Sequence, residues 1–333
     1  MIVEYLDKEY VADFWQDRIT HPNSVSVRVP GSTANLGPGF DTLAVALRIY
    51  LKLTLTLLPH DDNRIPLVTT LDANQEHLGI AASNFVSKIL KEHVKLEPQM
   101  LERIRVFIQS EIPIERGLGS SAAVTVGTLW AAAKLNSQIA KSSQLLTQAA
   151  IIEGHADNAA ASLLGGLATV VNSGNEQTVV ANKLAWPEKW EAILVIPARQ
   201  VPTAEARRLL PNNIPYKDAI YNLQHTALLL AAVQQQSEEL MRQALHDQLH
   251  EKYRSQLVPE LNELKKQLDG GPALGCVLSG AGSSILVLAH INKKKEIIEQ
   301  IELWRSSQST SSDLLALGID QAGLKELHGG HLP

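Results

Sequence analysis

The sequence predicts an α+β protein built from two domains. With 333 residues, the chain is long enough for two domains that each bury a core of their own. Apolar Val25, Val27 and Val29 alternate with polar residues, as do the leucines of 51–57, and this two-residue period is typical of half-buried strands. Over 81–96 the apolar residues instead recur every three or four positions, as in an amphipathic helix. Strands and helices are therefore mixed along the chain.

The rest of the first half repeats these two periods. Alternation over 104–108 predicts a strand, and the strand-like run at 166–174 predicts another. Small residues fill 120–135, where they favour a closely packed helix, and a further helix is expected over 143–153.

A polar, irregular stretch at 173–190 predicts the boundary between the domains. We place the first domain at 25–180 and the second at 181–333, and we interpret 1–24 as an amphipathic extension. The second half again mixes the two kinds of segment, with strands at 191–197, 274–280 and 284–289 and helices across 217–268 and 293–304.

Charge and composition limit the function. A formal net charge of -5 and a pI near 6.1 argue against a nucleic-acid-binding protein, which normally presents a basic face to phosphates. Cys276 is the only cysteine, so the chain has no internal disulfide or thiolate metal site, and a reducing, cytoplasmic location is expected. The longest apolar run, near 228–233, is far shorter than the roughly 20 residues that cross a bilayer. We therefore expect small-molecule partners, with neither nucleic acid nor membrane.

A glycine-rich turn before the helix at 120–135 has the composition of an anion-binding loop. Gly117 and Gly119 would let backbone amides approach phosphate oxygens, and the helix N-terminus would add free N–H donors. Ser120 and Ser121 would add hydroxyl groups. A tight turn with Ser120 as the N-cap is the alternative interpretation. No lysine follows in the position that a P-loop requires, so this is not a Walker motif.

Two further loops combine glycine with polar residues. In the loop after the first strand, Asn35 and Asp41 lie among glycines and supply acceptors, and Asn35 also donors, for a ligand. Both residues are also common turn formers, which is the alternative. A third loop, at 278–284, contains Gly280 and Gly282 between two strand-like runs, and alone it could be a hairpin.

The three loops together, in this order, resemble the three motifs of the GHMP kinase superfamily, at 30–41, 113–123 and 278–284. The resemblance covers about residues 24–320. It implies a two-domain GHMP kinase fold, with an N-terminal domain like domain 2 of ribosomal protein S5 and a ferredoxin-like C-terminal domain. The site should lie between the domains.

Further motifs resemble the homoserine kinase branch of that superfamily. "EGHADN" followed by "LLGG" at 153–166 resembles the segment that lines the substrate pocket, "PTAEARRLLP" contains Thr203 and Arg207, and "DQLHEKYRSQLVP" contains Arg254. Guanidinium groups bind carboxylates bidentately, so both arginines suit an α-carboxylate. Taken singly, such arginines are usually solvated charges, and His155 could be a structural histidine.

The resemblance implies an enzyme that uses ATP and Mg²⁺ to phosphorylate the hydroxyl of L-homoserine to O-phospho-L-homoserine, a step of threonine biosynthesis. It implies that the nucleotide phosphates are bound by Pro113, Gly117, Leu118, Gly119, Ser120, Ser121 and Ala122. It assigns the amino acid to Asn35, Asp41, His155, Thr203, Arg207 and Arg254. The catalytic residues would be Asn158 and Ser121, with Ser121 as a Mg²⁺ ligand. Asn158 replaces the aspartate base of the mevalonate kinase branch, and an amide cannot usefully accept that proton. A homodimer is compatible with the sequence.

One departure from the family concerns the metal. Thr147 occupies the position where the family usually carries a glutamate that binds Mg²⁺. In a continuous helix Glu153 would lie about 240° around the axis from Thr147, so we expect that it does not replace the missing ligand. Two alternatives stay open at this point: a GHMP kinase for another small alcohol, and a nucleotide-binding regulatory protein with negligible turnover.

Overall fold

The computed structural model describes most of the chain between its ends. The described residues are 23–59, 67–72, 80–94, 96, 98–136, 141–173 and 178–327. Almost all of the proposed extension at 1–24 therefore lies outside the described residues. Within the described part, no helix is both long and apolar enough to cross a membrane.

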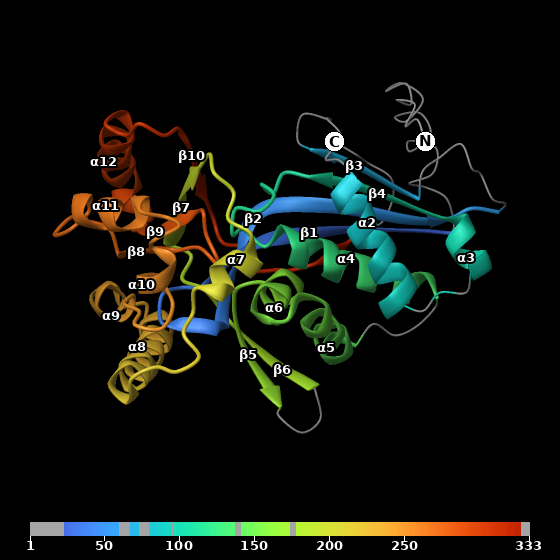
Figure 1. Cartoon of the computed structure of the whole chain (residues 1–333), viewed down its shortest axis with the longest axis horizontal. Helices are drawn as coiled ribbons and strands as arrows, with labels where there is room; N and C mark the ends of the chain where they lie inside the picture. The colour runs from blue at the N-terminus through green and yellow to red at the C-terminus, as the bar shows by residue number, and fades with distance from the viewer. Residues whose placement is uncertain are drawn as a thin grey trace.

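A seven-stranded sheet forms the right-hand half of the molecule in Figure 1. Its strands are β1 (Ser24–Asn35), β2 (Gly39–Leu57), β3 (Val68–Asp72), β4 (Ile104–Ser110), β5 (Leu167–Ser173), β6 (Thr178–Leu184) and β11 (Lys325–Glu326). The main path runs β11-β1-β2-β4-β3, while β5 pairs with β2 and β6 pairs with β5. All pairs are antiparallel except β3–β4, which is parallel. The alternating residues of β1 and β2 face each other in register, with Val27 opposite Leu53.

Helices pack on this sheet and bury its apolar side chains (Figure 1). They are α2 (Ile80–Lys88), the π-helix η1 (Ile89–His93), α3 (Pro98–Arg103), α4 (Ser120–Leu135), α5 (Ser142–Glu153) and α6 (Asp157–Leu164). The small residues of α4 allow a close approach: a Cβ at Gly127 would lie 3.2 Å from Val29 and 3.6 Å from Leu53. The N-terminus of α4 is thereby held beside the end of β1, where Ser32 N donates to Leu118 O at 3.0 Å.

The second half of the chain builds a four-stranded antiparallel sheet in the order β10-β7-β9-β8. Its strands are β7 (Trp190–Pro197), β8 (Gly275–Leu278), β9 (Ile285–His290) and β10 (Ser312–Leu317). Its helical segments are α7 (Thr203–Arg208), α8 (Tyr216–Gln235), α9 (Glu238–Ala244), α10 (Glu251–Arg254), α11 (Glu260–Gln267), the 3₁₀-helix η2 (Ile291–Lys293) and α12 (Lys294–Ser306). The predicted α+β class is confirmed.

The structure corrects two local predictions. Part of the stretch 173–190, expected to be irregular, forms β6, which pairs with β5 along its whole length and buries Val179. The helix predicted over 81–96 changes to a π-helix at Ile89 and ends at His93. The domain boundary near 180 stays a prediction, and β6 extends across it. The chain also returns to the first sheet after β10, since Arg48 N donates to Gly318 O and β11 pairs with β1.

Candidate active site

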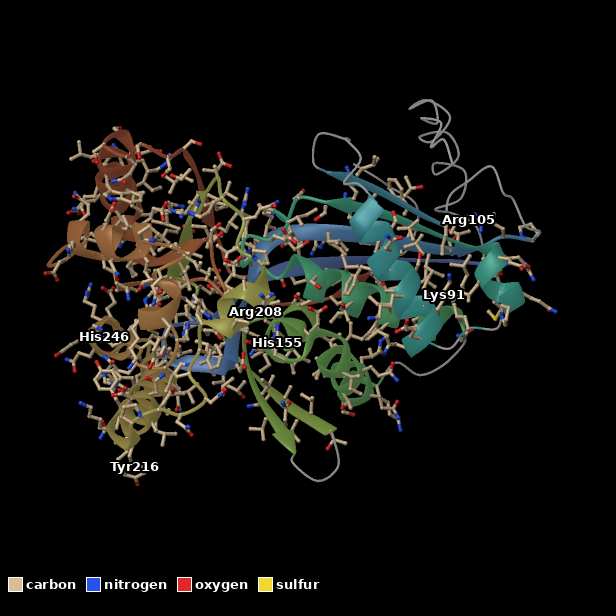
Figure 2. All side chains as sticks on the ribbon, viewed as in Figure 1. Lys91, Arg105, His155, Arg208, Tyr216 and His246 are labelled. Atoms are coloured by element: carbon tan, nitrogen blue, oxygen red, sulfur yellow. The ribbon has the colours of Figure 1, made fainter. Side chains whose placement is uncertain are left out.

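The two halves meet around one cavity of about 330 Å³. Figure 2 shows labelled His155 near the junction of the two halves, beside α7. Predicted site residues from segments far apart in the sequence line this cavity: Asn35, Asp41, Pro113, Gly117, Leu118, Gly119, Ser120, Ser121, Ala122, His155, Asn158, Thr203, Arg207, Arg254 and Gly280. Gly282 and Thr147 are not among its lining residues. The structure therefore brings together almost the whole predicted site.

The glycine-rich turn at 117–119 is shaped by close backbone contacts. Gly117 has φ 74°, and a Cβ there would lie 2.2 Å from Ser279 O. Gly119 has φ 71°, and a Cβ there would lie 2.2 Å from Ser32 Oγ. Both positions therefore require glycine. Gly119 is also the N-cap of α4 and provides no side-chain cap, so the first N–H groups of the helix stay available at the cavity wall. This arrangement suits an anion.

The other two glycine loops are tied directly to this turn and to each other. Asn35 Nδ2 donates to Gly280 O at 2.9 Å, and Gly280 N donates to Ala34 O at 3.1 Å. Ser279 Oγ donates to Gly117 O at 2.8 Å. Gly282 has a structural role, because its N–H donates to Ser279 O and closes the third loop. The third loop thus supports the other two, and only its Gly280 and Ala281 line the cavity.

Glu153 is the carboxylate that lies beside the anion-binding turn. Ser121 Oγ donates to Glu153 Oε1 at 2.9 Å, and Thr125 Oγ1 donates to the same oxygen at 2.5 Å. Thr147, by contrast, lines a separate cavity, where its hydroxyl donates to Ser143 O and accepts from Val179 N. Glu153, which we expected not to replace the missing carboxylate, therefore lies beside Ser121, whereas Thr147 does not. The two residues lie on different faces of α5, and the face toward Ser121 belongs to Glu153.

A buried hydrogen-bonded group lies at the start of α6. His155 Nδ1 lies 2.6 Å from Asp157 Oδ1, and the same oxygen accepts from Asn158 N at 2.7 Å. Burial lowers the pKa of His155, but the hydrogen bond and charge of Asp157 outweigh it, so the pKa is raised above its ordinary value. Ser32 Oγ donates to Asn158 Oδ1 at 2.8 Å. Asn158 Nδ2 donates a long hydrogen bond of 3.4 Å to Asp157 Oδ1, so the NH₂ group keeps its second N–H for a ligand.

Arginines from two helices define the opposite part of the cavity. Arg207 donates from Nη1 to Asp41 Oδ2 at 2.9 Å and from Nη2 to Asp41 Oδ1 at 2.7 Å. Arg254 is 2% exposed, and its Nη1 donates to Gly280 O at 3.1 Å. Burial and the nearby charge of Arg207 lower the pKa of Arg254 to about 10. Thr203, at the start of α7, lines the same region.

Sequence reasoning left three residues out of this arrangement. Glu153 was considered and rejected because of its angle from Thr147 around the helix axis, although it lies two residues before His155 in a quoted motif. Ser32 lies in a strand of buried residues and gives no such signal, since only folding brings it to Asn158. Phe40 precedes Asp41 in the second loop, and its contacts with both arginines arise from tertiary structure.

Two family models match the chain. "GHMP kinases N terminal domain" matches residues 84–166, and "GHMP kinases C terminal" matches residues 229–304. The first match contains the glycine-rich turn and the His155 segment. The second contains Arg254 and the third glycine loop.

The chain is also similar to curated and solved homoserine kinases. It is 37% identical over 288 residues to a homoserine kinase of Prochlorococcus marinus strain MIT 9515, covering 85% of this chain and 89% of that relative. It is 34% identical over 301 residues to a homoserine kinase of Synechocystis sp. strain PCC 6803, covering 90% and 97%. The crystal structure of homoserine kinase from Cytophaga hutchinsonii matches with a TM-score of 0.77 at 28% identity, covering 92% of this chain and 98% of that one. The two-domain GHMP kinase fold is thereby confirmed, and the chain belongs to the homoserine kinase family of GHMP kinases.

Proposed function

We propose that this protein transfers the γ-phosphoryl group of ATP to the hydroxyl of L-homoserine and releases O-phospho-L-homoserine and ADP. One observation supports this most strongly. A single cavity joins an uncapped helix N-terminus beside a glycine turn to a cluster of two arginines and two aspartates. The first part suits phosphates, and the second suits an amino acid. The names of the family relatives agree with this combination.

At the phosphate end, the backbone N–H groups of Ser120, Ser121 and Ala122 would bind nucleotide oxygens. The donor set also fits Mg²⁺, which prefers oxygen ligands and takes one or two carboxylates. Ser121 and Glu153 would hold it, since their oxygens lie 2.9 Å apart at the cavity wall. When bound, the ion would neutralise charge on the phosphate oxygens.

At the amino-acid end, the fixed charges complement a zwitterion. Arg207 and Arg254 attract a carboxylate, while Asp41 and Asp157 attract an ammonium group. All four lie close enough to influence one another, because the charges of Arg207, Asp41 and Asp157 all act on the pKa of Arg254. We assign the α-carboxylate to the arginines and the α-amino group to the aspartate side.

Asn158 lies where the two ends meet and offers an NH₂ donor, because Ser32 occupies its oxygen. An amide does not accept a proton at neutral pH, so we assign Asn158 to orientation and charge stabilisation. The carboxylate of Asp157 is already occupied by hydrogen bonds with His155 Nδ1 and Asn158 N, so we do not assign it as the base. The acceleration would then come chiefly from holding the hydroxyl in line with the phosphoryl group and from the donors of the glycine turn.

The test is a coupled assay of ADP release with homoserine, mevalonate, threonine and serine as acceptors. We expect turnover that saturates with homoserine and is at least about a hundredfold weaker in kcat/KM with the others, because lost contacts at buried polar groups are costly. Preferred turnover of another alcohol would show that the site serves a different GHMP substrate. Binding of ATP without ADP release under every acceptor would favour a regulatory protein.

A further inference from the structure

Phe40 lies beside both arginines of the amino-acid end. It is the second residue of β2 and directly precedes Asp41. The centroid of its ring is 5.1 Å from Cζ of Arg254 and 5.7 Å from Cζ of Arg207. Both distances fall within the range of about 6 Å over which a ring attracts a cation. One aromatic side chain therefore contacts guanidinium groups from two separate helices, α7 and α10.

The ring is itself held in place from the second half of the chain. His250 is fully buried and stacks on Phe40, with a centroid distance of 5.1 Å and an interplanar angle of 27°. Its Nε2 donates to Gly37 O at 2.9 Å. Asn222 Nδ2, on α8, donates to Pro38 O at 3.1 Å. These contacts fix the segment that ends in Phe40, so the ring is a rigid surface.

A ring and a carboxylate hold a guanidinium group in different ways. A carboxylate occupies the N–H donors of the guanidinium group. An aromatic face attracts the positive charge of the group and leaves its N–H donors free. Arg254 shows the result: its Nη1 reaches Gly280 O, while its buried Nε has no hydrogen-bond partner among the described residues. Because Arg254 also lines the cavity, it keeps donor capacity for a ligand.

Two neighbouring cations also repel each other. Burial and the charge of Arg207 both disfavour the charged form of Arg254, whose pKa is lowered to about 10. Asp41 is the only carboxylate bonded to Arg207 in the described part, and the charges of Asp41, Asp247 and Asp157 near Arg254 do not outweigh burial and the repulsion from Arg207. The negative face of the Phe40 ring attracts both guanidinium groups and thereby offsets part of their mutual repulsion.

We propose that Phe40 is a positioning residue that sets the spacing of the Arg207 and Arg254 guanidinium groups for the α-carboxylate of the substrate. This inference rests on the proposed function, because it takes an amino acid as the ligand of the two arginines. Phe40 would act through the arginines and would not touch the reacting atoms. Its loss should therefore affect the affinity for the amino acid more than the affinity for the nucleotide.

The first test is Phe40→Leu, followed by steady-state kinetics in which homoserine and ATP are varied separately. We expect KM for homoserine to rise about tenfold, equivalent to about 1.4 kcal/mol, while KM for ATP stays within about twofold. Phe40→Tyr keeps the ring and should restore KM for homoserine to within about threefold of the parent. As a control, Phe85→Leu removes another ring of the same cavity and should leave KM for homoserine within about twofold.

A second test separates the charge of the ring from its size. Pentafluorophenylalanine introduced at position 40 by nonsense suppression keeps nearly the same shape but reverses the ring quadrupole, so KM for homoserine should rise at least as much as in Phe40→Leu. An unchanged KM for homoserine in either variant would overturn the proposal, as would equal increases for homoserine and ATP. Absence of homoserine turnover in the parent protein would instead overturn the proposed function itself. KM does not depend on the folded fraction, so partial misfolding does not obscure the result.

Discussion

Arg207 and Asp41, 166 residues apart in the sequence, form a bidentate ion pair across the candidate active site. The pair joins α7 of the second half to the start of β2 in the first half. The hydrogen bond to Asp41 outweighs burial and raises the pKa of Arg207 above its already high ordinary value, so Arg207 stays charged. In the proposed assignment, a substrate carboxylate shares this guanidinium group with Asp41 and approaches it from the side of Arg254.

The bidentate guanidinium group of Arg207 predicts the effect of replacing this residue with lysine. Arg207→Lys keeps the charge but cannot bind Asp41 and a carboxylate at once, so KM for homoserine should rise at least about tenfold. KM for ATP should change less than about twofold, since the glycine turn is untouched. Kinetics with each substrate varied in turn checks both values. A KM for homoserine within twofold of the parent would remove Arg207 from the carboxylate site.

The position of Glu153 predicts the Mg²⁺ requirement. Glu153→Gln should raise the Mg²⁺ concentration for half-maximal rate about fivefold or more, because a close charge pair is worth on the order of 1 kcal/mol. Thr147→Glu, on the same helix but facing another cavity, is the matched control and should leave that concentration unchanged. Magnesium titrations at saturating ATP and homoserine measure both. A lower Mg²⁺ concentration for half-maximal rate in Thr147→Glu would show that position 147, and not Glu153, provides the metal carboxylate.

Ser121 contacts Glu153 and is the second residue of α4, directly after the glycine turn and Ser120. Ser121→Ala should lower kcat about tenfold or more, because it removes an oxygen ligand of the proposed Mg²⁺ ion. The ion's interactions with the phosphate oxygens strengthen in the transition state. Circular dichroism must match the parent protein, which excludes unfolding as the cause. If kcat is unchanged while the spectrum is native, Ser121 does not bind the metal ion.

Ser32 predicts an effect on turnover through Asn158. Ser32→Ala removes the hydrogen bond that fixes the amide, and the lost orientation should lower kcat roughly threefold to tenfold. KM for both substrates should stay within about twofold, because Ser32 is not among the residues that line the cavity. Ser32→Thr keeps the hydroxyl and should recover most of the rate. Equal loss in the alanine and threonine variants would show that packing, and not the hydroxyl, is responsible.

His155 and Asp157 predict a dependence on pH. An NMR titration of His155 should give a midpoint above the ordinary value of 6.5, and Asp157→Asn should lower it by removing the partner that raises it. Since the folded-state pKa is above the unfolded-state value, the pair stabilises the fold fully below about pH 6.5. That contribution disappears as the pH rises through the folded-state pKa. A midpoint that is insensitive to Asp157→Asn would contradict this assignment.

Local patterns predicted most of the elements because they depend on neighbouring residues. The helix expected over 120–135 is α4 to the residue, and that expected over 143–153 differs from α5 by one residue. The strand β6 was missed because its buried residue, Val179, is followed by the exposed Val180, so apolar and polar residues do not alternate along it. The change to a π-helix at Ile89 also has no signal in the apolar spacing.

The sequence by itself determined the glycine turn and the alternation of strands and helices, since each depends on residue type and on spacing of a few positions, whereas both arginines were identified through motifs that resemble those of homoserine kinases. Only the tertiary structure decided which face of α5 meets Ser121, and therefore that Glu153 and not Thr147 lines the cavity of the candidate active site. It also decided that Ser32 fixes Asn158 and that Phe40 lies beside Arg207 and Arg254. The contacts of Ser32 and Phe40 join residues more than a hundred positions apart, and they form only when burial of the cores outweighs the entropy of closing long loops.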